Sequence, residues 1–275
     1  MTTDNPLSRS LLGKQVASIE HYSPELLFSV ARALKREDIL GSSPLPFHGV
    51  DIWNAYELSW LNPKNKPEIA LAQFCFPCES PNLIESKSLK LYLHSFNETT
   101  FASQDRVQQT LIQDLSEACG MPVAVTLFKP EDVPLQLMRQ LPGESLDAID
   151  IACTKTALQT DALIASTEIV QETLCSNLLK SNCLVTGQPD WGSIQIRYHG
   201  PKLNREGLLR YLISHRYTQG FHEHCVERIF MDILQYGRPH ELTVTAKYTR
   251  RGGLDINPIR SNTQLKIDTS RLIRQ

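Results

Sequence analysis

The chain has 275 residues, of which 41% are hydrophobic and 21% charged, and its formal net charge is −2. This length suits one large domain or two ordinary ones, and the near-neutral charge argues against broad electrostatic binding of nucleic acid or anionic membrane. The first residues, MTTDNPLSRSLLGKQV, lack the basic stretch and apolar core of a signal peptide. No apolar run approaches the roughly 20 residues that span a bilayer. We therefore expect a cytoplasmic protein with no direct nucleic acid or membrane partner.

Seven cysteines are scattered over the chain, at positions 75, 78, 119, 153, 175, 183 and 225. Their odd number and irregular spacing fit reduced thiols better than a disulfide framework in a chain of this length. Any role for a cysteine is therefore expected to be packing, metal binding or nucleophilic chemistry.

Apolar periodicity predicts both strands and helices. In the first half we expect strands at 49–53, 68–76, 88–96 and 123–130. A helix is predicted over 104–120, which ends at a glycine and in which apolar residues recur at helical spacing: Val107, Leu111, Ile112 and Leu115. A linker with prolines at 134 and 142 follows over 131–147.

The second half repeats this order. Strands are expected near 167–185, at 193–200 and at 242–250, with a helix over 223–237. A shift of 119 positions lays SLKLYLHSF (88–96) over GLLRYLISH (207–215), and the same register matches Val107 to Val226 and Leu115 to Leu234. Because the matches keep their order, we expect a duplicated module, in which 88–96 and 207–215 are strands that precede a helix.

Cys183 is the first candidate for chemistry. A thiolate is a strong nucleophile when its pKa is lowered or a base stands near it. Asp190 follows after a Thr-Gly-Gln-Pro turn and is expected to return towards Cys183, where a carboxyl group can exchange a proton during addition to an unsaturated carbon. The alternative is a buried cysteine that packs as a small hydrophobe, with Asp190 beginning a turn. From spacing alone, the packing role is favoured.

Two other clusters resemble metal sites. In the run 222–225, His-Glu-His-Cys, consecutive helical residues do not all face one ion, so at most a subset ligates. Cys75 and Cys78 form a Cys-x-x-Cys pair without a second pair, which favours core packing. We expect no metal.

Two polar segments suit phosphate or a polar heterocycle. The first, 84–90, combines hydroxyls, lysines and backbone donors between apolar elements. The second, Arg250-Arg251-Gly252-Gly253, places two cations beside two glycines. Solvated surface loops are the alternative for both.

Three motifs together resemble a known family. They are a Glu-Ser-Lys-Ser-x-Lys run at 85–90, a Cys-x-x-Thr-Gly-Gln-Pro-Asp segment at 183–190 and Phe-His-Glu at 221–223. With these motifs the chain closely resembles the NADPH-dependent 7-cyano-7-deazaguanine reductases, the nitrile reductases of queuosine biosynthesis, a tRNA modification. The resemblance runs from about residue 10 to the end, in the long, two-module form. Short members carry all three motifs in one module.

The resemblance implies an α+β fold of tandem tunnelling-fold (T-fold) modules, each an antiparallel sheet with helices packed on one face. Residues 1–135 would form the N-terminal module with the Glu-Ser-Lys-Ser motif. Residues 136–275 would form the C-terminal module with the catalytic Cys/Asp pair and the His-Glu pair. The resemblance also implies a substrate site built from both halves, and a homodimer.

The resemblance further implies the role of each residue. Cys183 would attack the nitrile carbon to form a covalent thioimide, Asp190 would protonate the nitrogen, and His222 would assist proton transfer. Two NADPH per turnover would then give the primary amine. The 7-deazaguanine base would be bound by Ile84, Glu85, Ser86, His222 and Glu223. NADPH would be bound by Ser86, Lys87, Arg251 and Gly252, without the Gly-x-Gly-x-x-Gly run of a dinucleotide-binding domain.

Two other functions stay open at this point. A metal-dependent cyclohydrolase or pterin-type enzyme on the same fold would make His222, His224 and Cys225 candidate ligands, although a full metal set is missing. A non-catalytic purine-binding or scaffold protein is disfavoured because Cys183, Asp190 and Glu223 are all present.

Overall fold

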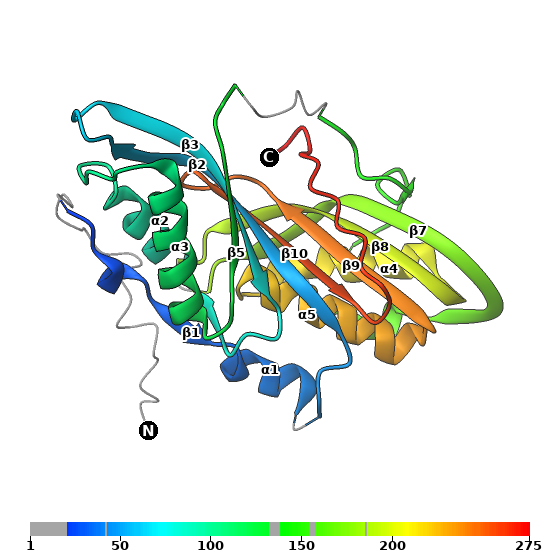
Figure 1. Cartoon of the computed structure of the whole chain (residues 1–275). Coiled ribbons are helices and arrows are strands. Elements are labelled where there is room, and N and C mark those ends of the chain that lie inside the picture. The colour runs from blue at the N-terminus through cyan, green and yellow to red at the C-terminus, as the bar shows by residue number, and fades with distance from the viewer. Residues whose placement is uncertain (1–20, 42, 132–137, 154–157, 185) are drawn as a thin grey trace. The chain divides into compact units, whose positions relative to one another are not determined.

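The computed structural model describes residues 21–41, 43–131, 138–153, 158–184 and 186–275 (Figure 1). The N-terminal segment considered above and part of the predicted linker lie outside these ranges. The chain divides into two compact units. Unit 1 takes in the described residues of Met1–Leu34, Asp51–Gln136 and Arg250–Asp255. Unit 2 takes in those of Lys35–Val50, Leu137–Thr249 and Ile256–Gln275.

Both halves of the chain contain strands and helices, which confirms the α+β class. The elements up to residue 128 are the short 3-10 helix η2 (Pro24–Leu26), β1 (Ser29–Ala31), α1 (Ala33–Leu40), β2 (His48–Leu61), β3 (Pro67–Pro77), β4 (Asn82–Ile84), α2 (Ser86–His94), α3 (Gln104–Cys119) and β5 (Ala124–Phe128). Those that follow are β6 (Glu144–Ser145), η3 (Thr160–Ala162), β7 (Ala165–Asn182), β8 (Pro189–Leu203), α4 (Arg205–Ser214), η4 (His215–Tyr217), α5 (His222–Asp232), the π-helical turn η5 (Ile233–Gly237), β9 (Glu241–Tyr248) and β10 (Leu254–Ser261).

Unit 1 is built on the strand order β5-β3-β2, with a small antiparallel pair of β1 and β4. The predicted helix at 104–120 is confirmed as α3, which begins after the Ser103 N-cap and ends at Gly120. Its apolar stripe is buried against β4 and β5, through Val107, Leu111, Leu115 and Cys119. Ile112, also in the predicted pattern, lies on the exposed side.

Unit 2 is built on the strand order β10-β9-β8-β7-β6, of which β7 to β10 are labelled in Figure 1. Helix α5 contacts β9, and α4 contacts β7. β7 and β8 form a long antiparallel hairpin, and β9 continues the antiparallel order beside β8. The expectation of purely antiparallel sheets is wrong at one edge, because β6 runs parallel to β7. β6 follows the linker and satisfies backbone groups that β7 would otherwise leave open at the sheet edge.

Two predicted strands are helices instead. The segment 88–96 lies largely in α2, and 207–215 lies largely in α4. Each helix begins at a residue whose side chain accepts backbone N–H groups of the first turn, Glu85 in one case and Asn204 in the other. The buried positions of α2 recur at helical spacing: Ser88, Leu89, Tyr92 and Leu93. In a segment of nine residues with mixed polarity, the apolar pattern fits a strand and a helix about equally well. The capping residues favour the helix.

The shift of 119 positions also relates the observed elements. Adding 119 to the bounds of α2 gives 205–213, nearly the bounds of α4. The same addition carries α3 to 223–238, over α5 and η5, and β5 to 243–247, inside β9. Apart from the three-residue strand β4, the order of two strands, two helices and a strand therefore occurs twice.

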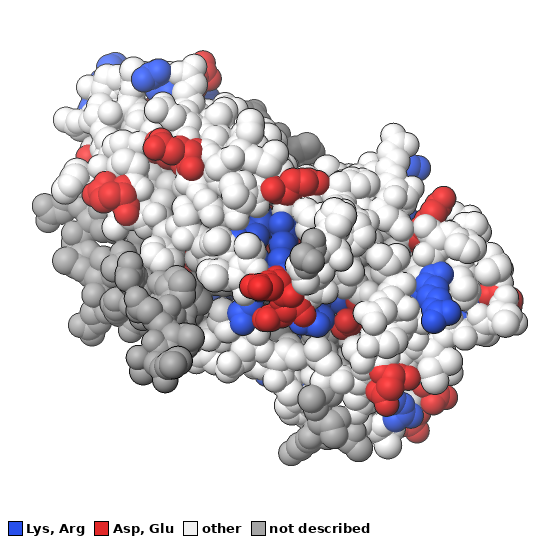
Figure 2. Space-filling model, turned by 90° about the horizontal axis from the view of Figure 1, so that it is seen from below, with Lys and Arg blue, Asp and Glu red and all other residues white. Residues whose placement is uncertain are grey.

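The surface carries charges of both signs. On the face shown in Figure 2, Lys and Arg side chains lie among Asp and Glu side chains, and most of the visible surface belongs to other residues. No extended one-sign patch stands out among the described residues of this face, in keeping with the small net charge. In the described parts of the chain, no helix combines the length and apolar character that crossing a bilayer requires.

Candidate active site

The turn of the β7–β8 hairpin carries Cys183 and Asp190. The last ladder pairs are Ser181 with Asp190 and Asn182 with Pro189. The Cys183 N–H then donates to the Gln188 carbonyl at 2.8 Å, and the Gly187 N–H donates back to the Cys183 carbonyl at 3.0 Å. Gly187 has φ of 65°, a left-handed conformation that favours glycine. The turn thus places Asp190 diagonally across the hairpin from Cys183, and both residues are buried.

The loop before α5 is held against this hairpin. Asn182 donates its side-chain amide to the carbonyls of Arg216 and Thr218, each at 2.9 Å. Its backbone N–H donates to the Thr218 carbonyl, and its carbonyl accepts from the Gly220 N–H. These bonds fix the start of α5, where His222 and Glu223 lie, beside the residue that precedes Cys183.

His222 faces Asp190. Its Nε2 lies 3.7 Å from Asp190 Oδ1, and both side chains are largely shielded from solvent, at 13% and 5% exposure. The His222 ring packs edge-to-face against Tyr248, with centroids 4.1 Å apart. Glu223 is buried in the first turn of the same helix, where a carboxylate is favoured by the helix dipole. Four predicted site residues of unit 2 therefore occur on two adjoining segments.

Helix α5 is anchored by a buried ion cluster one turn after Glu223. Glu227 accepts hydrogen bonds from Arg36 at 2.9 and 2.6 Å and from Arg260 at 3.0 and 2.8 Å. Burial opposes ionisation of Glu227, but the two guanidinium groups outweigh it and lower its pKa to about 2. This cluster ties α5 to segments far away in the sequence.

Unit 1 carries the other predicted substrate residues at the junction of β4 and α2. Ile84 is buried at the end of β4, and Glu85 caps α2. The Glu85 carboxylate accepts the N–H groups of Lys87 and Ser88, each at 2.8 Å. The Ser88 hydroxyl donates to the Glu85 carbonyl at 2.7 Å. The Glu-Ser-Lys-Ser run is thus also a helix-capping device, which sequence reasoning did not find.

Removing this cap is expected to destabilise the protein independently of any substrate. Glu85→Ala deletes both carboxylate acceptors and should lower the free energy of unfolding by about 0.5–2 kcal/mol. Urea denaturation of the two proteins measures the difference. Glu79→Ala, which removes an exposed glutamate of the same unit, is the control and should change stability little. Equal stability of Glu85→Ala and the wild type would contradict the capping role.

The predicted cofactor residues Arg251 and Gly252 lie in a tight turn beside α2. The Arg251 N–H donates to the Leu254 carbonyl at 2.8 Å. A Cβ on Gly252 would come within 3.2 Å of Lys90 Cδ, so this lysine of α2 lies against the glycine backbone. Arg250 stacks over the Tyr56 ring at 3.7 Å. The turn and the lysine-bearing helix therefore adjoin within unit 1.

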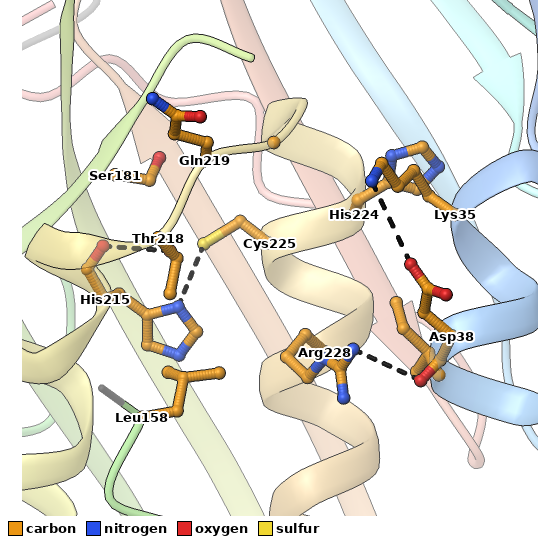
Figure 3. A pocket seen from close by; sticks show the side chains of 12 residues that line it. Lys35, Asp38, Leu158, Ser181, His215, Thr218, Gln219, His224, Cys225 and Arg228 are labelled. Atoms are coloured by element: carbon orange, nitrogen blue, oxygen red, sulfur yellow. Dashed lines mark hydrogen bonds and ion pairs between the residues drawn. The ribbon is translucent and has the colours of Figure 1, made fainter. Parts of the chain in front are cut away.

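The candidate metal residues are not gathered into a ligand set. Among the described residues, no group of three or more His, Cys, Asp or Glu side chains is placed to hold an ion. Cys225 contacts His215 instead, with 3.6 Å between Sγ and Nδ1 (Figure 3). Burial raises the pKa of Cys75, and Cys78 is buried, in keeping with packing roles.

Sequence reasoning missed two residues at the site, Tyr248 and Glu227. Tyr248 occupies the inward phase of β9, with Leu242, Val244 and Ala246. A tyrosine in a buried phase needs a polar partner, and this signal was available in the sequence. Nothing in the local sequence marks Glu227, because its partners are remote.

The comparisons with known proteins cover most of the chain. A family model described as "Nitrile reductase, 7-cyano-7-deazaguanine-reductase N-term" matches residues 18–127, and one described as "QueF-like protein" matches residues 189–266. A curated protein of Chromobacterium violaceum named NADPH-dependent 7-cyano-7-deazaguanine reductase is 56% identical over 92% of this chain and 91% of its own length. Proteins of the same name from Hydrogenovibrio crunogenus and Burkholderia lata are 52% and 53% identical, over 97% and 98% of this chain and 97% and 100% of their own lengths. The chain belongs to the family of NADPH-dependent 7-cyano-7-deazaguanine reductases.

Proposed function

We propose that this chain reduces the nitrile of 7-cyano-7-deazaguanine to the primary amine with NADPH, in queuosine biosynthesis. The observation that carries the proposal is the placement of Cys183, Asp190 and His222 on two adjoining segments of unit 2, in a chain whose relatives are named for this activity. The reaction needs a nucleophile, a proton donor and a site for the base, and the motifs supply a candidate for each.

Cys183 is the proposed nucleophile. Its sulfur bonds to the nitrile carbon as one C–N π bond breaks, Asp190 donates a proton to the nitrogen, and the Asp190 carboxylate takes up the thiol proton, which gives a covalent thioimide. A nitrile accepts hydride poorly, whereas a protonated C=N bond accepts it well. His222 lies beside the Asp190 carboxyl group and is proposed to assist its proton transfer.

Residues of both modules are proposed to bind the base. Glu223 would accept hydrogen bonds from the guanine-like edge, which presents N–H donors. Ile84, Glu85 and Ser86 would contact the base from unit 1, and His222 from unit 2. The Glu85 carboxylate already accepts two backbone N–H groups, so any further donor would share its remaining lone pairs.

The residues proposed to hold NADPH fit a phosphate-bearing cofactor. Lys87, Lys90, Arg250 and Arg251 supply cations in unit 1, and the glycine turn leaves backbone free of a Cβ beside Lys90. When bound, NADPH supplies hydride. Ser86, Lys87, Arg251 and Gly252 would bind and orient it.

The proposal includes the finer architecture. Tandem tunnelling-fold modules at 1–135 and 136–275 are supported by the recurrence of elements at a shift of 119. A homodimer, cytoplasmic localisation, the absence of a metal and the absence of a nucleic acid partner stay predictions.

The test starts from the wild-type protein. Mixed with the nitrile alone and analysed by intact mass, it should gain the mass of one substrate per chain, because thiol addition needs no reductant. With NADPH present, two NADPH should be consumed per nitrile. The absence of an adduct, or a consumption ratio of one, would overturn the mechanism, and a requirement for added zinc would favour a metal-dependent enzyme instead.

A further inference from the structure

The proposed reaction consumes protons at a buried carboxyl group. Reduction of a nitrile to a primary amine adds four hydrogens, two as hydride and two as protons. Addition of the Cys183 thiol and its later release consume no net proton. Because a carboxyl group carries one proton at a time, Asp190 must be reloaded within each turnover. Asp190 is only 6% exposed, and bound substrate would occupy the side towards Cys183, so the proton needs another route.

Two buried hydroxyls lie near Asp190. Ser181 is its direct partner in the β7–β8 ladder, so the two Cβ atoms are about 4.5–5.5 Å apart on one face of the sheet. Tyr248 of β9 pairs with Gly192 of β8, and the Tyr248 ring packs against His222. Neither hydroxyl makes a well-formed hydrogen bond with a described residue, and their polar neighbours include each other, the Cys225 thiol and Asp190.

Two groups near these hydroxyls, the Cys225 thiol and the His215 imidazole, are uncharged at neutral pH. Burial raises the pKa of the Cys225 thiol to about 11, although Tyr248 and Ser181 oppose the rise. Burial likewise lowers the pKa of His215 to about 3 and raises that of Tyr248 well above its ordinary value. A neutral hydroxyl accepts and donates at once, so it can pass a proton without burying a charge.

A cavity of about 170 Å³ reaches Ser181 and Cys225 of this cluster, although Tyr248 does not line it (Figure 3). Ser181, His215 and Cys225 line its inner part, and Asp38, with a 62% exposed side chain, lines its outer part. The volume accommodates several waters. His215 Nε2 and Ser181 Oγ are both buried without a hydrogen-bond partner among the described residues. Buried polar atoms beside a cavity are usually hydrogen-bonded to water.

We propose that the hydroxyls of Ser181 and Tyr248 relay protons from water in this cavity to the His222–Asp190 pair. The inference rests on the proposed role of Asp190 as proton donor. In each event a buffer acid at the cavity mouth loses a proton to the water chain, the hydroxyl accepts one proton and donates another, and the Asp190 carboxylate becomes protonated. The relay groups end unchanged, and a water between the Ser181 hydroxyl and the Asp190 carboxylate would complete the path.

The test separates thiol addition from turnover. Ser181→Ala and Tyr248→Phe each remove one hydroxyl, and the second keeps the ring that packs against His222. In both variants the adduct with nitrile alone should form at the wild-type rate, because it takes no proton from solvent. Steady-state kcat should fall by about 10- to 100-fold, with a larger solvent deuterium isotope effect and little change in KM.

Thr218→Val is the matched control, because it removes a hydroxyl that lines the same cavity and donates to the His215 carbonyl. It should keep the wild-type kcat and isotope effect. Wild-type kcat and isotope effect in both relay variants would overturn the proposal. So would adduct formation slowed as much as turnover, since the hydroxyls would then only position the site. Failure of the wild type to form an adduct would instead overturn the proposed function itself.

Discussion

Cys183→Ala should lose the covalent adduct completely and lower kcat by about 10⁴- to 10⁶-fold. Without the sulfur, hydride would have to attack the nitrile itself, and no activated C=N bond forms. Intact mass with nitrile alone reads the adduct, and NADPH consumption reads turnover. Cys183 is buried at the turn. Its replacement by alanine removes only the sulfur atom, so circular dichroism should show the native fold.

Cys153→Ala is the control for this experiment. Cys153 is an exposed thiol, so its loss should leave both adduct and turnover unchanged. An undiminished adduct in Cys183→Ala would show that another cysteine is the nucleophile. An adduct that each variant reduces only in part would point to nonspecific thiol chemistry.

Glu227→Gln should be the most destabilising single substitution among those considered, by about 3–5 kcal/mol. It leaves the Arg260 guanidinium, which is fully buried, without its carboxylate, and weakens the bidentate pair with Arg36. The measurement is the free energy of unfolding in urea. Glu168→Gln breaks an exposed ion pair with Lys202 and should change stability by less than about 1 kcal/mol.

The loss of unfolding free energy in Glu227→Gln should depend on pH in a defined direction. The pKa of Glu227 falls from its ordinary 4.5 to about 2 in the folded protein. The stabilisation is therefore fully present above pH 4.5 and is lost as the pH falls from 4.5 towards 2. The difference between wild type and Glu227→Gln should shrink over this interval. A difference that stays constant down to pH 2 would show that the charge of Glu227 is not its source.

Local sequence determined several parts of this protein. The helix at 104–120 was predictable because its apolar stripe, its Ser103 cap and its terminal glycine agree. The hairpin at 167–200 was predictable from two apolar strands around a Thr-Gly-Gln-Pro turn. The three motifs also sufficed to place the chain in its family, because residue identities at fixed short spacings can be recognised without any knowledge of packing.

Other elements escaped local reasoning. β10 carries Asp255, Asn257 and Arg260, yet every residue of the strand is buried. Its polar residues argue against a buried strand. They are buried because partners far away in the sequence satisfy them: the Asp255 carboxylate accepts hydrogen bonds from Asn54 and Tyr56 in the same unit. For α2, the helical period became clear only when its burial and its cap were known.

The candidate site shows the same division. The sequence by itself determined which side chains are present, namely Cys183, Asp190 and the Phe-His-Glu run, and hence the chemistry they can perform. Only the tertiary structure decided that His222 faces Asp190, that Tyr248 packs against His222, and that Glu227 binds arginines 191 and 33 residues away. Burial and pairing between distant segments depend on how the whole chain packs, and no local pattern encodes them.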